Sequence, residues 1–274
     1  MRYSALASGS NGNCYYVAKD NIAVLIDVGI NSKHIHLRMD NLGINPADIN
    51  AIFVTHEHTD HIRGLAVFSR RYQIPIFMTQ GTYDGSKLEI PAHLLNIIQT
   101  NSMVQLGPLS IYGVPKFHDA REPCSFLVSD GIHNISVLTD IGRVCDNIKK
   151  AIKISDVLLL ESNFDEDLLE NGRYPHYLKN RIRSGDGHLS NSCSLAALLA
   201  SKTSRLKHLI LGHLSGENNT TAIVEQTFSP HCQDVKLSIA NRVENTALFE
   251  LNAEVNQVAE TLCLKKVAAQ VSLF

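Results

Sequence analysis

A run of metal-ligand side chains lies early in the chain, where residues 55–61 read Thr-His-Glu-His-Thr-Asp-His. His56, His58, Asp60 and His61 bring three imidazoles and one carboxylate together directly after an apolar segment. Imidazole nitrogens and carboxylate oxygens suit zinc, manganese and iron, and the absence of a nearby cysteine argues against a structural thiolate site. A polar surface loop is the alternative, but this density of ligands favours a metal site.

Three further potential ligands come from distant segments of the chain. His118 lies in Pro-Lys-Phe-His-Asp-Ala, Asp140 in Leu-Thr-Asp-Ile-Gly and His213 in Leu-Gly-His-Leu-Ser. Each follows a predicted strand, and side chains at strand ends of a layered α/β protein converge on one edge. A lone histidine at a strand end is more often structural, so these three carry weight only together with the run at 55–61.

The first part of the chain predicts short strands joined by glycine- and asparagine-rich turns, followed by helices that alternate with strands. The expected strands are Tyr3–Ala7, Cys14–Ala18, Ile22–Val28 and Ala51–Thr55. The expected helices are Asn31–Leu42 and His61–Tyr72. The histidine-rich run therefore follows a buried strand and precedes a helix.

The remainder predicts a second group of strands and then an alternation of helices and strands. The expected strands are Ser110–Phe117, Cys124–Ser129, Asn134–Thr139, Val157–Leu160, Leu206–Leu211 and Val235–Ile239. The expected helices are Val144–Ser155, Tyr177–Ile182, Asn191–Ser201 and Asn219–Phe228. No linker-like composition separates the two halves, so we expect one α/β domain over residues 1–274, with a tail of uncertain structure at 255–274.

Composition excludes several classes of protein. The hydrophobic fraction of 44% and charged fraction of 19% are those of an ordinary globular protein. The N-terminus lacks the pattern of a signal peptide and no apolar stretch is long enough to span a membrane, so a cytoplasmic location is expected. The net charge of -2 gives no global attraction to a polyanion, so nucleic-acid binding requires a local basic surface.

Residues 173–207 are the strongest basic stretch, with seven lysines or arginines against one acid, Asp186. A basic surface beside a metal site is the arrangement that a phosphate backbone needs. A solvated helix face is the alternative for any such run of charges. The seven cations are Arg173, Lys179, Arg181, Arg183, Lys202, Arg205 and Lys207.

In the order and spacing of these motifs the chain resembles the metallo-β-lactamase superfamily, which implies a four-layer αββα sandwich and a binuclear metal-dependent hydrolase. The resemblance implies one metal site from His56, His58 and His118 and a second from Asp60, His61 and His213. It also implies that Asp140 bridges the two metals. Asp27, at the end of a predicted strand, would hold a ligand in place from behind, although a turn residue is the other interpretation.

Within this superfamily the chain is similar to the YycJ/WalJ-type branch. The residues that carry this likeness are Leu-Leu-Leu-Glu-Ser-Asn at 158–163, Gly-His-Leu-Ser-Asn at 187–191, Gly-His-Leu-Ser-Gly-Glu-Asn-Asn at 212–219 and Ala-Ser-Gly-Ser-Asn-Gly-Asn at 7–13. The chain departs from the branch at Phe164, where we would expect a histidine. The resemblance implies a 5′-to-3′ DNA exonuclease, with DNA as its partner.

The reaction expected for this site is phosphodiester hydrolysis by a hydroxide shared between two divalent metals, zinc or manganese. Asp60 is expected to orient that hydroxide as well as bind a metal. His188, which no metal shell requires, is the best candidate to contact the phosphate or protonate the leaving oxygen. The remaining candidate substrate contacts are Arg181, Arg183, Ser190 and Asn191, although Ser190 also fits a helix N-cap.

Two other functions fit the same ligands. One is an enzyme of the same fold that hydrolyses a small phosphodiester or a thioester, which metal ligands alone do not distinguish from a nuclease. The other is a non-catalytic scaffold, against which the complete set of seven ligands argues. The Ser-Gly-Ser-Asn-Gly-Asn segment at 8–13 is either a backbone nest for phosphate or a plain hairpin turn.

Overall fold

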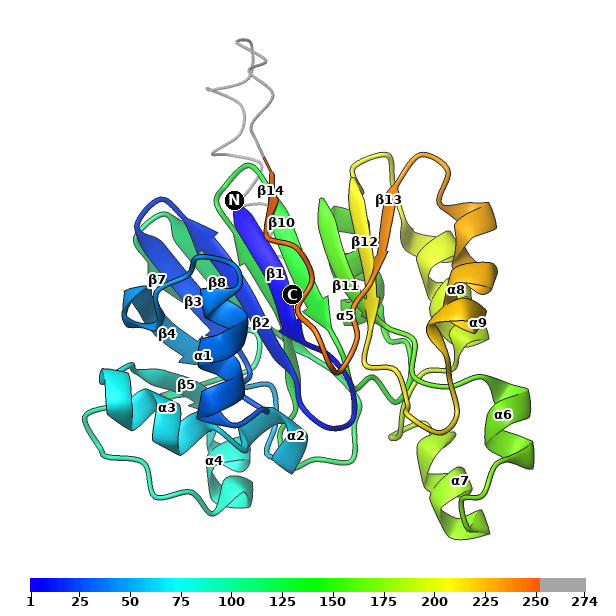
Figure 1. The fold of residues 1–274 in the computed structure, drawn as a ribbon, viewed down its shortest axis with the longest axis horizontal. Coiled ribbons are helices and arrows are strands. Elements are labelled where there is room, and N and C mark those ends of the chain that lie inside the picture. The colour runs from blue at the N-terminus through cyan, green and yellow to red at the C-terminus, as the bar shows by residue number, and fades with distance from the viewer. Residues whose placement is uncertain (252–274) are drawn as a thin grey trace.

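The computed structural model describes residues 1–251, so the predicted tail at 255–274 lies outside the described residues. Within 1–251 the strands form two seven-stranded sheets (Figure 1). The first runs in the order β14 (Phe249–Glu250), β1 (Arg2–Ala7), β2 (Cys14–Lys19), β3 (Ile22–Ile26), β4 (Ile49–Phe53), β5 (Ile76–Thr79) and β6 (Leu95–Ile98). The second runs in the order β13 (Lys236–Ile239), β12 (His208–Gly212), β11 (Val157–Glu161), β10 (Asn134–Leu138), β9 (Cys124–Ser129), β8 (Leu109–Pro115) and β7 (Met103–Leu106).

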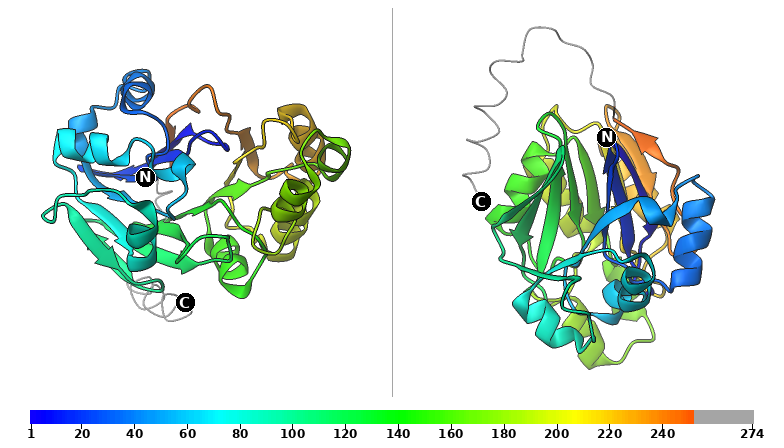
Figure 2. Two further views of the ribbon diagram at one scale, coloured as in Figure 1. Left: turned by 90° about the horizontal axis from the view of Figure 1, so that it is seen from below. Right: turned by 90° about the vertical axis from the view of Figure 1, so that its left-hand side faces the viewer.

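Helices cover the outer faces of the two sheets, and the two helices at 166–171 and 176–182 lie beyond one edge of the second sheet (Figures 1 and 2). They are α1 (Ser32–Asp40), α2 (Thr59–Ile62), α3 (Leu65–Tyr72), α4 (Gln80–Ser86), α5 (Asp146–Ile154), α6 (Glu166–Asn171), α7 (His176–Ile182), α8 (Asn191–Ser201) and α9 (Thr221–Phe228). Two 3₁₀ turns occur at Pro46–Asp48 and Ser229–His231.

Three hydrophobic cores separate the layers, because alternate residues of each strand face opposite sides of its sheet. In β11, Val157 and Leu159 join the core between the two sheets, whereas Leu158 and Leu160 join the core under the outer helices. A third core packs the first sheet against α1 and α3 through side chains such as Phe68. The predicted four-layer αββα sandwich is confirmed.

The helix predicted over His61–Tyr72 is wrong in its continuity, since it is two helices, α2 and α3, with a break at Gly64. The Gly64 amide donates to the Val28 carbonyl at 2.9 Å, and a Cβ at Gly64 would lie 2.1 Å from the Ile30 carbonyl oxygen. The break therefore lets the chain pass close under the loop that follows β3. Residues 76–106, which received no prediction, form β5, α4, β6 and β7.

Strands β3, β4, β8, β10, β11 and β12 all end at one edge of the sandwich, and the parallel pairings within each sheet set this common polarity. Three residues just after these strand ends, Asp27, Asp140 and His213, have φ between +54° and +61°. Left-handed backbone is costly for residues other than glycine and concentrates at functional sites. No helix within residues 1–251 is long and apolar enough to cross a membrane.

Candidate metal centre

The first group of donors is formed by His56, His58 and His118, whose ligand atoms lie within 4.8 Å of one another. His56 follows β4 and is fully buried, and His118 follows β8 and is nearly so. The His118 Nε2 atom lies 3.2 Å from His58 Nδ1. Three imidazoles that face one point from two sheets offer nitrogen atoms of the kind that bind divalent metals.

The second group is formed by Asp60, His61, Asp140 and His213, again with ligand atoms within 4.8 Å of one another. Asp140 lies between the other members, because its Oδ2 atom is 3.0 Å from His61 Nε2 and its Oδ1 atom is 3.2 Å from His213 Nε2. The same Oδ1 atom lies 3.8 Å from His118 Nε2 of the first group. The Asp140 carboxylate therefore faces both groups.

Protonation states of most donors at this site match what metal binding requires. His61 is the exception: burial disfavours its charged form, but Asp140 and Asp27 outweigh burial and raise its pKa well above the usual value, so this ring must release a proton when a metal binds. Burial lowers the pKa of His118 to about 2 and also lowers the pKa of His56 and His213. Burial alone would raise the pKa of Asp140, but attraction to His213 and His61 outweighs it and holds that pKa well below its usual value. Neutral imidazoles beside an ionised carboxylate are the forms that bind divalent cations.

Two buried atoms test whether a metal fits. His56 Nε2 is buried and has no hydrogen-bond partner within the described chain, and the buried Asp140 Oδ2 has only His61 Nε2 nearby, at 3.0 Å. The other nitrogen of His56 lies 2.9 Å from the Thr55 hydroxyl. His118 Nδ1 donates to the Gly187 carbonyl at 3.0 Å, which leaves its Nε2 lone pair facing the site. Buried polar atoms without partners are costly in a folded protein, so this donor set fits divalent metal.

Asp27 holds one wall of the second group from behind. Its Oδ2 atom accepts from His61 Nδ1 at 2.7 Å, and its Oδ1 atom accepts from the Thr55 amide at 2.8 Å. The carboxylate is fully buried. It thereby fixes the ring of His61 with Nε2 toward Asp140, which is how a carboxylate behind a metal-binding histidine acts.

Asn13 also supports the centre, a role that the sequence analysis did not predict for it. Its Oδ1 atom lies 3.1 Å from His213 Nδ1, and its Nδ2 atom lies 3.1 Å from His61 Nε2 and 3.3 Å from Asp60 Oδ2. The turn at residues 8–13 is thus neither a free hairpin nor a simple nest. The glycine- and asparagine-rich opening motif was the available signal for this role.

Glu161 is a second supporting residue that the sequence interpretation missed, although a carboxylate at the end of an apolar strand was a visible signal. It is fully buried at the end of β11, and its Oε1 atom lies 2.7 Å from His188 Nδ1. Its Oε2 atom accepts from the Ile141 amide at 2.7 Å. Asp140, Glu161, His188 and His213 also converge within 4.8 Å. His188 therefore lies directly beside the second donor group, with its Nδ1 atom bound to Glu161.

Ser190 and Asn191, predicted as substrate contacts, are used inside the protein. Both are buried, and the Ser190 hydroxyl accepts from the Cys193 amide at 3.2 Å as the N-cap of α8. The Asn191 Oδ1 atom accepts from the Ser162 hydroxyl at 2.6 Å and from the Asn219 amide at 2.8 Å. The polar atoms of both residues thus satisfy buried partners inside the protein, and their contact with substrate stays a prediction.

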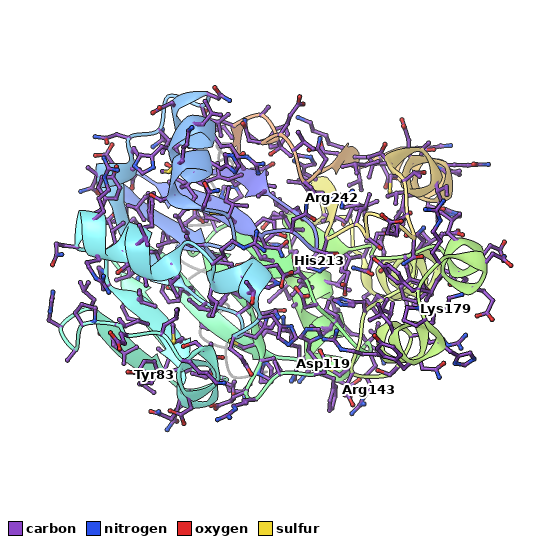
Figure 3. All side chains as sticks on the ribbon, turned by 60° about the horizontal axis from the view of Figure 1, so that its bottom comes forward. Tyr83, Asp119, Arg143, Lys179, His213 and Arg242 are labelled. Atoms are coloured by element: carbon purple, nitrogen blue, oxygen red, sulfur yellow. The ribbon has the colours of Figure 1, made fainter. Side chains whose placement is uncertain are left out.

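The two arginines predicted to contact substrate lie on α7 and its C-cap, and each is already paired with an acid. Arg181 Nε donates to Asp119 Oδ2 at 2.5 Å, and Arg183 Nη1 donates to Glu170 Oε2 at 2.8 Å. The other oxygen of Asp119 lies 3.4 Å from His118 Nε2. Asp119, which sequence reasoning missed, therefore lies between α7 and the first donor group (Figure 3).

The basic stretch does not form one continuous surface, contrary to our interpretation of residues 173–207. Lys202, Arg205 and Lys207 precede β12, whereas His213 follows it, so these three cations lie at the edge opposite the donor groups. Arg205 there forms an ion pair with Asp156 at 2.8 Å. Helix α8 separates the two halves of the stretch, which a count of charges along the chain does not reveal.

Comparison with known proteins places this arrangement in a family. The profile of the Metallo-beta-lactamase superfamily matches residues 7–99. Exodeoxyribonuclease YycJ of Bacillus anthracis is 32% identical over 247 residues, which cover 89% of this chain and 94% of that protein. Exodeoxyribonuclease WalJ of Streptococcus pneumoniae serotype 2 (strain D39) is 33% identical over 232 residues, which cover 83% of this chain and 86% of the relative.

Solved structures share the fold at lower identity. The metallo-beta-lactamase fold protein YhfI of Bacillus subtilis has a TM-score of 0.69 at 17% identity, covering 89% of this chain and 98% of that chain. The short form of human tRNase Z has a TM-score of 0.62 at 16% identity, covering 91% of this chain and 100% of that chain. Together with the donor groups, these similarities identify the chain as a hydrolase of the metallo-β-lactamase superfamily that belongs to its YycJ/WalJ family.

Proposed function

We propose that this protein is a metal-dependent exonuclease that shortens DNA from a 5′ end. The observation that carries the proposal is the pair of adjoining donor groups that meet at Asp140, in a chain 32% identical to a protein named as an exodeoxyribonuclease over 89% of its length. Within this proposal the protein acts on DNA in the cytoplasm.

We assign the ligands as the two groups divide them. One metal is held by His56, His58 and His118, a second by Asp60, His61 and His213, and Asp140 contacts both. Two divalent ions at this position, zinc or manganese, would activate water and neutralise charge that develops on the phosphate. Asp27, Asn13 and Glu161 hold these side chains in place through the hydrogen bonds described above.

Asp60 and His188 then act on the reacting groups. Burial alone would raise the pKa of Asp60, but its attraction to His61 lowers that pKa to about 2. Asp60 is therefore an ionised acceptor that can orient the attacking water. Burial disfavours the charged form of His188, but Glu161 outweighs it and raises the pKa. His188 Nε2 can then donate a proton to the leaving oxygen while Nδ1 stays bound to Glu161.

A panel of substrates tests this function. The purified protein, loaded with Mn²⁺ or Zn²⁺, is incubated with single-stranded DNA, double-stranded DNA and RNA, each labelled at the 5′ or the 3′ end. We expect 5′-labelled DNA to release label first as short products, while 3′-labelled DNA shortens gradually. Intact DNA, combined with rapid turnover of bis-p-nitrophenyl phosphate or a thioester, would replace the nuclease with a small-molecule hydrolase.

A further inference from the structure

A groove of about 580 Å³ lies beside the donor groups, between the turn at 8–13, α1 and the segment at 241–245. This volume is in the range of pockets that hold a small organic ligand. None of the metal ligands lines it. The lining residues are Asn11, Ile30, Asn31, His34, Leu37, Arg38, Asn41, Arg63, Arg242, Val243, Glu244 and Asn245. The lining therefore combines arginine and asparagine side chains with aliphatic ones, unlike a purely apolar docking surface.

The groove carries cations that no acid neutralises. Arg63 Nη1 donates to the Asn11 carbonyl at 3.0 Å, and Arg242 Nη1 lies 3.4 Å from Asn11 Oδ1. Within residues 1–251 neither arginine forms an ion pair, although Glu244 also lines the groove. Each guanidinium has five N–H donors, so both retain donors for an anion. An anionic group is the ligand that this charge distribution favours.

Arg38 fixes the wall that carries Arg242. Arg38 is buried and donates to the carbonyls of Leu6 at 2.6 Å, Arg242 at 2.8 Å and Val243 at 2.9 Å. Its guanidinium thus serves the backbone, and it holds the segment at 242–243 against β1. The backbone of Arg242, whose side chain lines the groove, is therefore held in place, which reduces the entropy cost of binding a ligand there.

The groove also has an apolar side. Leu37 is 57% exposed and Val243 is 80% exposed. Both line the groove, together with the buried Ile30. Exposed aliphatic side chains opposite guanidinium groups suit a ligand with both a flat apolar part and a negative charge. A nucleotide within a strand, with its base and its phosphate, has this combination.

The groove is continuous with the metal centre along three segments. Arg63 follows His61 by two residues, and Asn11 precedes Asn13, which contacts His61 and His213. Arg242 lies over two glycines of the loops around the centre, since an added Cβ would lie 2.3 Å from its side chain at Gly9 and 2.0 Å at Gly216. Figure 3 shows Arg242 and Asp119 on opposite sides of His213.

We propose that this groove binds a nucleotide of the substrate strand next to the cleaved bond, with Arg63 and Arg242 on its phosphate and Leu37 and Val243 against its base. The proposal rests on the proposed nuclease function. The groove holds DNA by charge and shape without reading sequence, because guanidinium contacts to phosphate carry no base information. The groove lies on the side of the centre opposite α7.

The test compares the double variant Arg63→Ala/Arg242→Ala with Arg2→Ala/Lys207→Ala. The second pair removes the same charge from exposed side chains at the opposite edge of the sheets. Binding of fluorescent single-stranded DNA is measured in EDTA, which prevents cleavage, at several salt concentrations. We expect the groove variant to bind about tenfold more weakly, with a salt slope lower by about 1.4 for two lost phosphate contacts. The control pair should bind within about twofold of wild type.

Turnover of bis-p-nitrophenyl phosphate with metal separates the groove from the centre. This diester is too small to fill both sites, so the groove variant should hydrolyse it as wild type does. Wild-type DNA binding in the groove variant would overturn the inference while leaving the nuclease intact. A wild-type protein that neither binds nor cuts DNA would instead overturn the proposed function. A free mononucleotide that binds as tightly as the oligonucleotide would overturn strand binding in the groove.

Because the Arg242 side chain packs on two glycines, its replacement by alanine could disturb folding. A second pair of variants therefore tests the groove without changing Arg242. Leu37→Glu places a negative charge in the groove, and Leu37→Gln places a neutral group of the same size there. Leu37 is 57% exposed on α1, so both variants should fold. We expect the glutamate variant to bind DNA at least about threefold more weakly than the glutamine variant. Equal binding by the two would contradict the inference.

Discussion

The two basic surfaces beside the donor groups differ in what their arginines contact. On α7 and its C-cap, Arg181 and Arg183 are each paired with a carboxylate. On the opposite side, the side chains of Arg63 and Arg242 form hydrogen bonds with Asn11, and within residues 1–251 neither forms an ion pair. A paired arginine must give up its acid before it can hold a phosphate, whereas an arginine without an acid need not. Charge density along a sequence is therefore a poor guide to where a polyanion binds.

The largest expected effect tests whether both surfaces serve one centre. Asp140→Ala removes the carboxylate that faces both donor groups, so neither metal keeps its set of ligands. We expect loss of metal and a fall in activity of more than about 10²-fold on DNA and on bis-p-nitrophenyl phosphate alike. Elemental analysis and both assays measure this effect. Retained hydrolysis of either substrate with less than one metal per chain would mean that the reaction occurs elsewhere.

His188→Ala separates chemistry from substrate binding on either surface. His188 is held by Glu161 and belongs to neither proposed metal shell, so we expect the metal content to persist while kcat falls by about 10²–10⁴-fold. His176→Ala is the matched control, since His176 is an exposed histidine at the start of α7 whose ring forms a hydrogen bond with Asn180. Loss of metal in the His188 variant would make that residue a ligand instead.

Asp27→Asn tests the support behind the second donor group, away from both surfaces. Asparagine tolerates the left-handed backbone at this position, so the change removes charge rather than the fold. Because His61 loses its ionised partner, we expect metal affinity to fall about 10–100-fold. Asp130→Asn provides a control, because Asp130 pairs with His133 at 3.4 Å far from the centre. Unchanged affinity in Asp27→Asn would assign Asp27 to the turn alone.

The smallest expected effect comes from the α7 side. Because Arg181 and Arg183 are already neutralised by Asp119 and Glu170, their joint replacement by alanine should weaken DNA binding only about two- to threefold. The salt slope should change by less than half of the change expected for Arg63 and Arg242. Measurement of the two double variants side by side decides the comparison. A larger loss from the α7 pair would reverse the roles of the two surfaces.

The donor groups could be predicted from sequence because most of their residues directly follow strands in the chain. A strand of alternating or continuous apolar residues is recognisable in the sequence, and a polar residue that directly follows such a strand must lie at the edge of the sheet. His118, Asp140 and His213 each follow this rule, and the structure brings them together with the run at 55–61. The residues behind them were harder to predict, because Asn13 and Glu161 act through contacts between segments far apart in the chain.

The surroundings of the centre could not be predicted from sequence, because they depend on contacts between side chains that lie far apart in the chain. Arg181 on α7 pairs with Asp119, which follows β8, and Arg242, which follows β13, packs on Gly9 and Gly216 beside the centre. The helix break at Gly64 was missed because apolar periodicity continues across it, while the reason for the break is a close approach to Ile30. Local pattern does not contain these contacts.

Metal titration of the metal-free protein tests the central claim most directly. Protein stripped with a chelator receives Mn²⁺ or Zn²⁺ in steps, and shortening of 5′-labelled single-stranded DNA is measured at each step. If the two donor groups that meet at Asp140 form the reaction centre, DNA cleavage is absent without metal and reaches its plateau at two equivalents per chain. Full cleavage by the stripped protein, or no cleavage at any metal content, would contradict the account.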